Sequence, residues 1–236
     1  MVIGARSIAA GCAIATWVVI ACNSVLGIDS AVSEQCLNAC PAGIDPSCST
    51  YCTAVMSNCT APTFVAYQSC DVCCTMCGVY VSQAQGDYGS QSDTTGNNIY
   101  CRINHALAAA KDPATECPNA GPLGGTACVN SADTDPCATF CALDLAFCSA
   151  GVDRPACSDG GLIDPADLPY ADGGCLDLCE TYDYQPASQV LAPANNSTNT
   201  LNCRQYHLQN YLSSCNPMHC QHTDVASMAC TLPPGQ

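Results

Sequence analysis

The chain has 236 residues, of which 24 are Cys, 3 are Phe and 1 is Trp, and its 5 Lys and Arg against 20 Asp and Glu give a formal net charge of −15 at pH 7. This acidity excludes charge-driven binding to nucleic acid or to anionic lipid headgroups, because both would be repelled. With so few large apolar side chains, the fold is expected to need covalent cross-links as well as a hydrophobic core.

The first 21 residues have the pattern of an export signal. Arg6 supplies a positive charge, and the apolar run at 8–19 that follows is shorter than a typical membrane span. The run ends in Val19-Ile20-Ala21-Cys22, which resembles the bacterial lipobox. The resemblance implies cleavage before Cys22, a diacylglycerol on its thiol and acylation of the new amino terminus. Asn23, in place of Asp, then favours the outer membrane. The alternative is a signal cut elsewhere, with Cys22 an ordinary cysteine.

The cysteines predict a disulfide framework. Removing Cys12 with the signal and reserving Cys22 for lipid takes the 24 cysteines to 22, an even number. In an exported chain such a density favours disulfides over metal ligands, because the compartment is oxidising. Each native bridge contributes about 2–4 kcal/mol by restricting the unfolded chain.

The spacing of the cysteines repeats, and it predicts two related units. We expect a signal at 1–21, a tether at 22–39, a first unit at 40–128 and a second unit at 129–236. Both units begin C-x3-C-x6-C, contain a second C-x3-C, and have 23 residues before a Cys-Arg-x-x-His motif. These motifs occur at Cys48/Cys52/Cys59, Cys73/Cys77 and Cys101-Arg102-Ile103-Asn104-His105 in the first unit, and at Cys137/Cys141/Cys148, Cys175/Cys179 and Cys203-Arg204-Gln205-Tyr206-His207 in the second.

The spacing also predicts helices. Positions i, i+4 and i+11 share one helical stripe, so Cys48, Cys52 and Cys59 would line one face of a helix that starts near Ser47. Polar loops are expected at 86–98, 158–174 and 185–200, and a helix at each Cys-Arg-x-x-His motif. The predicted fold class is therefore mainly α, small and disulfide-rich, with two tandem units that each hold a stapled helical hairpin plus polar loops.

The paired C-x3-C motifs resemble the helical hairpins of alpha-hairpinin peptides, in which such motifs are cross-linked outer to outer and inner to inner. The resemblance covers about 30–43 residues of each unit. It implies four bridges: Cys48–Cys77, Cys52–Cys73, Cys137–Cys179 and Cys141–Cys175. The remaining connectivity cannot be deduced from the sequence.

The chain as a whole resembles cysteine-rich lipoproteins predicted from myxobacteria and their relatives. The resemblance is carried by Ala21-Cys22-Asn23-Ser24-Val25-Leu26-Gly27-Ile28 and by Gly96-Asn97-Asn98-Ile99-Tyr100-Cys101-Arg102-Ile103-Asn104-His105. It implies export and lipidation and brings no activity with it. The pattern of this group includes His-Cys-x-His near the end of each unit. Here the second unit has His219-Cys220-Gln221-His222, whereas the first has Glu116-Cys117-Pro118-Asn119.

The best candidate site combines His207, His219 and His222, with Met218 as a further ligand. Imidazoles with a thioether suit copper, and imidazoles alone suit zinc. The alternative is structural, with His105 and His207 capping a helix or bonding to the backbone. Arg102 and Arg204 are expected to pair with local acids or carbonyl groups.

Other chemistry has weaker support in the sequence. Cys70-x-x-Cys73 and Cys74-x-x-Cys77 suggest thiol redox activity, but no strand and helix alternation surrounds them. Common hydrolase, metalloprotease and phosphate-binding motifs are absent from the sequence. We therefore expect a non-enzymatic, structural or partner-binding lipoprotein of the cell envelope, held to a membrane by lipid, with an unknown protein or surface partner and no nucleic acid. The alternatives are a copper- or zinc-binding protein and a thiol–disulfide redox protein; no other cofactor is expected.

Overall fold

The computed structural model describes parts of both expected units and one residue before them. The described residues are 36, 40–60, 64–83, 88–129, 136–148, 174–185, 199–224 and 227–231. The expected signal at 1–21 and the expected lipid site Cys22 lie outside these ranges, as does the expected tether apart from Cys36. Within the described ranges, each helix is too short or too polar to cross a membrane.

The described fold is helical in both units. The first unit contains α3 (Pro46–Asn58), α4 (Cys70–Gln83), α5 (Ile99–Ala108) and α6 (Pro113–Ala120). The second unit contains α7 (Cys137–Cys148), α8 (Cys175–Cys179), α9 (Leu201–Ser214), α10 (Met218–Gln221) and α11 (Met228–Thr231). Between the described residues, β pairing is limited to an isolated bridge that joins Asp183 and Thr200. The mainly α, disulfide-rich fold class is confirmed.

Side-chain caps fix where the main helices begin. The Asp45 carboxylate accepts a hydrogen bond from the Ser47 amide at 2.8 Å, and Pro46 occupies the first turn, so α3 begins just before the expected Ser47. Asn98 and Thr200 cap α5 and α9 in the same way, by accepting from the amide three residues later. The two Cys-Arg-x-x-His helices therefore start two residues before their cysteines.

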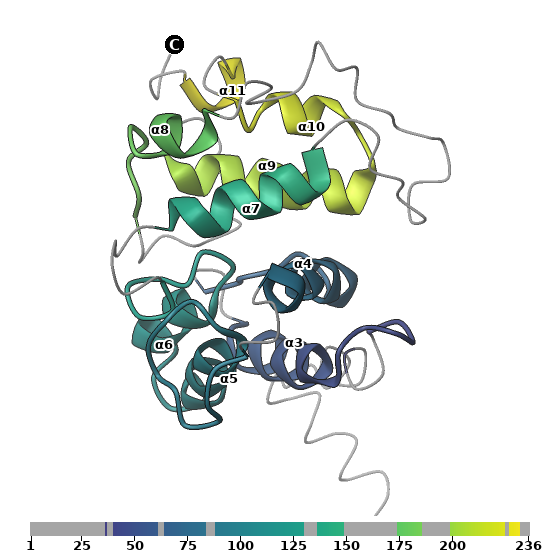
Figure 1. Cartoon of the computed structure of the whole chain (residues 1–236), viewed down its shortest axis with the longest axis vertical. Helices are drawn as coiled ribbons and strands as arrows, with labels where there is room; N and C mark the ends of the chain where they lie inside the picture. The colour runs from purple at the N-terminus through teal and green to yellow at the C-terminus, as the bar shows by residue number, and fades with distance from the viewer. Residues whose placement is uncertain are drawn as a thin grey trace, which may run out of the picture.

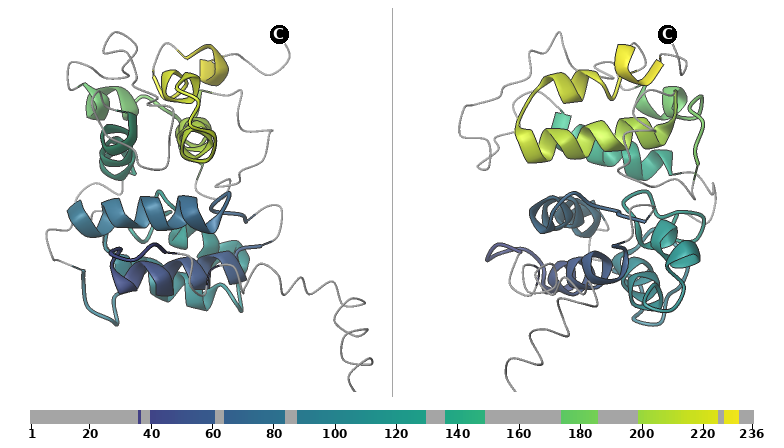
Figure 2. Two further views of the ribbon diagram at one scale, coloured as in Figure 1. Left: turned by 90° about the vertical axis from the view of Figure 1, so that its right-hand side faces the viewer. Right: turned by 180° about the vertical axis from the view of Figure 1, so that it is seen from behind.

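The two units form two layers that share the larger of two core clusters. Figure 1 shows α3 to α6 in one layer and α7 to α11 in the other, and Figure 2 shows α4 between α3 and the pair α7 and α9. Buried apolar side chains from both units meet in a single cluster. They include Val55, Val72, Met76 and Ile103 of the first unit and Leu143, Phe147, Leu208 and Tyr211 of the second. The units are therefore packed against each other as parts of one body.

Polar contacts fix the register between the layers. Gln209 on α9 is 1% exposed; its amide nitrogen donates to the Ala66 carbonyl at 2.9 Å and its amide oxygen accepts from the Gln68 amide at 3.2 Å. The Ser213 hydroxyl donates to the Gln68 side chain at 2.8 Å. One glutamine thus satisfies two backbone groups of the other unit, as a neighbouring segment of backbone would.

Matching disulfides hold each unit. The first unit has Cys48–Cys77, Cys52–Cys73, Cys59–Cys117 and Cys101–Cys128. The second has Cys137–Cys179, Cys141–Cys175, Cys148–Cys220 and Cys203–Cys230 at the corresponding places. The first two pairs of each set are those implied by the resemblance to alpha-hairpinins. The third pair of each set ties the end of the first hairpin helix to the helix after Cys-Arg-x-x-His, and the fourth ties the Cys-Arg-x-x-His helix to a more distant segment.

Two further bridges belong to the first unit alone. Cys36 bonds to Cys70 and Cys40 bonds to Cys74, each across 34 residues. Cys36 is 1% exposed, although it falls in the segment expected to be a tether at 22–39. The cross-linked fold therefore includes Cys36, and a free tether would have to end before it.

The two C-x-x-C motifs are not dithiol pairs. Their four cysteines belong to four different bridges, to Cys36, Cys52, Cys40 and Cys48 in turn. Each cysteine in the described ranges is disulfide-bonded. The thiol redox alternative therefore finds no reduced pair in the described part of the chain.

Candidate functional site

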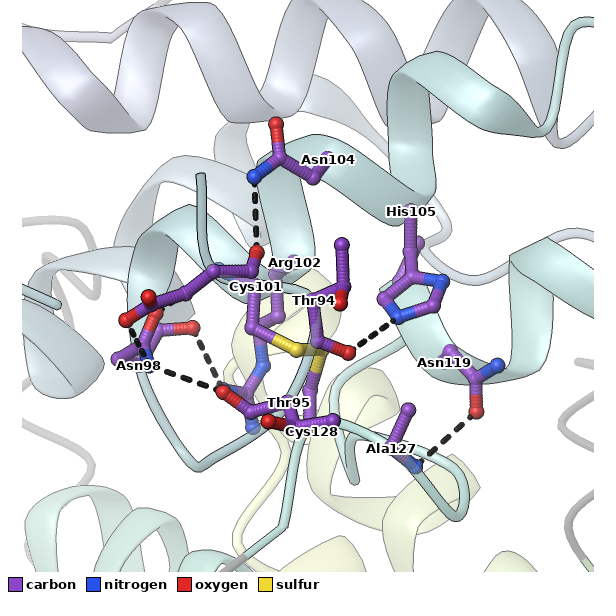
Figure 3. The surroundings of a disulfide bond; sticks show 12 residues. Thr94, Thr95, Asn98, Cys101, Arg102, Asn104, His105, Asn119, Ala127 and Cys128 are labelled. Carbon is purple, nitrogen blue, oxygen red and sulfur yellow. Dashed lines mark hydrogen bonds between the residues drawn. A yellow bond between two sulfur atoms is a disulfide. The ribbon is translucent and has the colours of Figure 1, made fainter. Parts of the chain in front are cut away.

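The two Cys-Arg-x-x-His motifs lie at matching places in the two units. In the first unit, Cys101 on α5 is bonded to Cys128, and Figure 3 shows Arg102 and His105 around this disulfide. In the second unit, Cys203 on α9 is bonded to Cys230. Because the histidine follows the cysteine by four residues, it lies one turn along the same helix face.

Arg102 is fully buried against an aromatic ring. Its Nη1 donates to the Asn98 carbonyl at 3.3 Å, and its guanidinium lies 4.6 Å from the centroid of the Tyr80 ring. Gly124, with φ of +79°, closes the space beside it: an added Cβ there would lie 2.1 Å from the Cys128 carbonyl oxygen. A glycine is required at that turn because the backbone approaches so closely.

Arg204 is buried in the same way in the second unit. Its guanidinium lies 3.4 Å from the centroid of the Tyr182 ring, and Nη1 donates to the Thr200 carbonyl at 3.2 Å. Its Nη2 donates to the Asn199 side chain at 3.0 Å and to the Asp224 carbonyl at 3.4 Å. The expectation of carbonyl partners for the arginines agrees with these contacts. Two residues named as site candidates thus act inside the scaffold.

The tyrosines beneath the arginines are functional parts of the scaffold that the sequence reasoning missed. Tyr80 follows Cys77 by three residues, and Tyr182 follows Cys179 by three. Both units therefore have a Cys-x-x-Tyr motif at the end of the second hairpin helix, and this motif can be seen in the sequence. The sequence alone does not show that each tyrosine ring lies under a buried guanidinium, where a cation–π contact stabilises the positive charge of the arginine.

A chain of buried phenols connects to Arg102. The hydroxyl of Tyr67 lies 2.6 Å from that of Tyr51 and 3.2 Å from that of Tyr80. Burial raises the pKa of Tyr51 and Tyr67 well above the usual range, and it raises the pKa of Tyr80 to about 12. These phenols therefore stay neutral and serve as hydrogen-bonding core residues.

His105 is held by two oxygen atoms. Its Nδ1 contacts the Glu116 carboxylate, and its Nε2 lies 3.0 Å from the Thr94 carbonyl oxygen, as Figure 3 shows for Thr94. A carboxylate and a backbone carbonyl oxygen thus lie at the two ring nitrogens. Asn119, nearby, accepts backbone hydrogen bonds from residues 126 and 127. In the first unit the motif histidine is thus held between a side-chain carboxylate and a backbone carbonyl, a structural contact of the kind given as the alternative for His105.

In the second unit a cluster of three imidazoles takes the place of this histidine–carboxylate contact. His207 on α9 and His219 on α10 have their Nδ1 atoms 3.1 Å apart. The ring centroid of His207 is 5.4 Å from that of His219 and 4.7 Å from that of His222, and the last two are 6.2 Å apart. The structure therefore brings together the three histidines that the sequence analysis singled out.

His207 is buried, and the other two rings of the cluster have lowered pKa values. His207 is 7% exposed. Burial, reinforced by the charge of His222, lowers the pKa of His219, and burial alone lowers the pKa of His222. Their nitrogen lone pairs are consequently present at neutral pH. Met218, proposed as a further ligand, has a side chain that is 55% exposed, and the three rings meet without it.

Sulfur atoms also lie close to these histidines, but they are not thiolates. A ring nitrogen of His105 and the sulfur atoms of Cys101 and Cys128 lie within 4.8 Å of one another. The same holds for His207 with Cys203 and Cys230. Both cysteine pairs are disulfides, which lack the thiolate that a soft metal ion needs. Imidazole nitrogens are thus the ligands that this part of the molecule offers.

Comparison of the chain with protein-family models, with curated proteins and with solved structures found no match.

Proposed function

We propose that this chain is an exported, lipid-anchored protein of the cell envelope, and that its two copies of one disulfide-linked unit form a rigid, non-enzymatic scaffold for binding a partner. The observation that carries the proposal is the matching set of four disulfides in each unit. Such a framework is stable only where thiols stay oxidised, which supports a place outside the cytoplasm.

The binding surface that we propose lies at the start of α3. A hollow of about 620 Å³ is lined there by Asp45, Pro46, Ser47, Thr50, Tyr88, Gln91, Tyr100 and Ile103. The Tyr88 hydroxyl donates to the Asp45 carboxylate at 3.1 Å. Tyrosines at a polar rim offer an apolar ring and a hydrogen-bonding hydroxyl together, which is the combination enriched at protein interfaces.

The loop beside this hollow is fixed in place. The side-chain amide of Asn104 on α5 donates to the Gln91 carbonyl at 2.9 Å and to the Asp93 carbonyl at 2.8 Å. The Asp93 carboxylate accepts from the Ser90 amide at 2.8 Å. A loop held by a helix in this way presents its polar groups at little entropic cost, which supports a role in recognition.

One preparation tests both halves of the proposal. Protein from the membrane fraction of cells grown with labelled palmitate is expected to carry the label and to show almost no thiol that reacts with an alkylating agent after denaturation without reduction. Cys22→Ala is expected to lose the label and leave the membrane, whereas Cys12→Ala is expected to keep the label. Label that persists in Cys22→Ala removes the anchor, and abundant reactive thiols remove the oxidised scaffold.

A further inference from the structure

We propose that His207, His219 and His222 form a binding site for a divalent transition-metal ion such as Zn²⁺ or Cu²⁺. Three imidazoles from two helical segments converge there, at the contact between α9 and α10. Imidazole nitrogen is a preferred ligand of both ions. The proposal concerns metal binding, and it does not depend on the lipid anchor or on the partner surface.

The spacing of His207 and His219 fits a shared ion, with His222 beside them. Two nitrogens bound to one tetrahedral zinc ion at about 2.0–2.1 Å lie about 3.3 Å from each other. The Nδ1 atoms of His207 and His219 are 3.1 Å apart. Three imidazoles on one such ion have ring centroids roughly 5 Å apart, and the three separations here are 4.7, 5.4 and 6.2 Å. The 6.2 Å between His219 and His222 is the widest of the three, so the side chain of His222 would have to turn for its nitrogen to reach the same ion.

Disulfides fix the backbone that carries these rings. Cys203, one turn before His207, is bonded to Cys230, and Cys220, between His219 and His222, is bonded to Cys148 of α7. Because the ligand-bearing segments are already held together, ion binding needs little further ordering of the chain. Such preorganisation is what distinguishes a built site from chance proximity of histidines.

The first unit shows what the same place looks like without a metal site. Glu116 precedes Cys117 as His219 precedes Cys220, and Asn119 corresponds to His222. There, the carboxylate of Glu116 satisfies His105, and Asn119 accepts two backbone hydrogen bonds. The second unit has imidazoles at both places, so its cluster has no carboxylate from the position of Glu116.

The first unit also supplies the matched variant. His219→Glu with His222→Asn gives the second unit the residues that already fold beside His105. Metal-free, oxidised protein is titrated at neutral pH with Zn²⁺ alone and with Cu²⁺ alone, and bound metal is measured after desalting. The original chain is expected to retain one equivalent, and the double variant is expected to bind about tenfold more weakly or worse.

The controls separate loss of ligands from loss of fold. His105→Gln in the first unit is expected to leave the stoichiometry at one, and His222→Asn alone tests the third ligand in an otherwise unchanged chain. Circular dichroism and a thiol count verify each variant. The proposal is overturned if the original chain retains no ion at about 10 µM free metal, or if the double variant binds as tightly as the original. The Cys22→Ala protein can be used for every titration, so the metal-binding result can be interpreted even if the proposed lipid anchor is wrong.

Discussion

The two buried arginines show how single residues serve the scaffold. Arg102 and Arg204 are both 0% exposed, in a chain with only 5 Lys and Arg. Each donates to the carbonyl of its helix cap and lies over a tyrosine ring. Lysine could not replace them, because it lacks the planar fork that stacks on a ring while donating to oxygens at its edge. These two cations therefore belong to the interior of the fold, which leaves 3 of the 5 Lys and Arg elsewhere in a chain with 20 Asp and Glu.

The ionisation of Asp45 makes the stability of the fold depend on pH, and one substitution isolates this effect. Hydrogen bonds from Ser47, with a smaller one from Tyr88, lower the pKa of the Asp45 carboxyl below 3.8. A depressed pKa means that its contribution to stability is present above the unfolded-state pKa and is lost as pH falls through the folded-state pKa. Asp45→Asn keeps a capping side chain and removes this titration. The difference in Tm between the original chain and Asp45→Asn is expected to be constant above about pH 5 and to shrink toward about pH 2.

Ser47→Ala is the companion variant for this experiment, because it removes the largest cause of the lowered pKa of Asp45. In that background the pH dependence should move toward the range of an ordinary aspartate. A Tm difference that stays unchanged across the whole acid range would show that Asp45 does not contribute in this way.

At the scale of helices, α4 is the element on which the two layers meet. It packs on α3 and α5 in its own unit and on α7 and α9 in the other. Beside it, α9 faces the first unit with Gln205 and Gln209, which are 5% and 1% exposed. The amide of Gln209 favours one docking arrangement, because its nitrogen and its oxygen are both paired with backbone groups of the first unit.

Replacing Gln209 tests this contact. Gln209→Ala leaves the Ala66 carbonyl and the Gln68 amide without their partner and should lower the free energy of unfolding by about 1–3 kcal/mol. Denaturation by guanidinium, followed by circular dichroism, measures the change. Gln91→Ala, at an exposed position, is the control and should have almost no effect. Equal midpoints for both variants would mean that the amide is dispensable.

The hairpins were predictable from sequence, and much of the rest was not. Cysteines at i and i+4 define a helix face locally, so the resemblance to alpha-hairpinins was enough to pair Cys48 with Cys77 and Cys52 with Cys73. Bridges such as Cys59–Cys117 join separate elements, and their pairing depends on how whole helices pack. The three histidines were named from sequence, but their convergence depends on the place that the Cys148–Cys220 bridge gives to α10.

In the molecule as a whole, long-range bridges replace part of what a large apolar core would supply. Cys148–Cys220 spans 72 residues and Cys203–Cys230 spans 27. Loop-closure entropy makes the longer bridge the more stabilising of the two, at about 4.4 against about 3.6 kcal/mol. Removing both cysteines of the longer bridge by Cys→Ala should therefore lower the unfolding free energy more.

Guanidinium denaturation of the two double variants measures this order. Both proteins need a thiol count first, because an unpaired or reshuffled cysteine would change the comparison. If removal of Cys203–Cys230 proved the more damaging, contacts in the folded state, and not the length of the closed loop, would dominate the value of these bridges.

The bonds from Cys36 to Cys70 and from Cys40 to Cys74 have a mechanical consequence. Tension applied to the chain ahead of Cys36 would enter α4 directly through covalent bonds. The tension would bypass the hydrogen bonds of α3. The chain between Cys36 and Cys70 could not be extended, because the disulfide closes it into a loop. Since α4 contacts helices of both layers, such a pull would be shared by the whole body instead of peeling it open from one end.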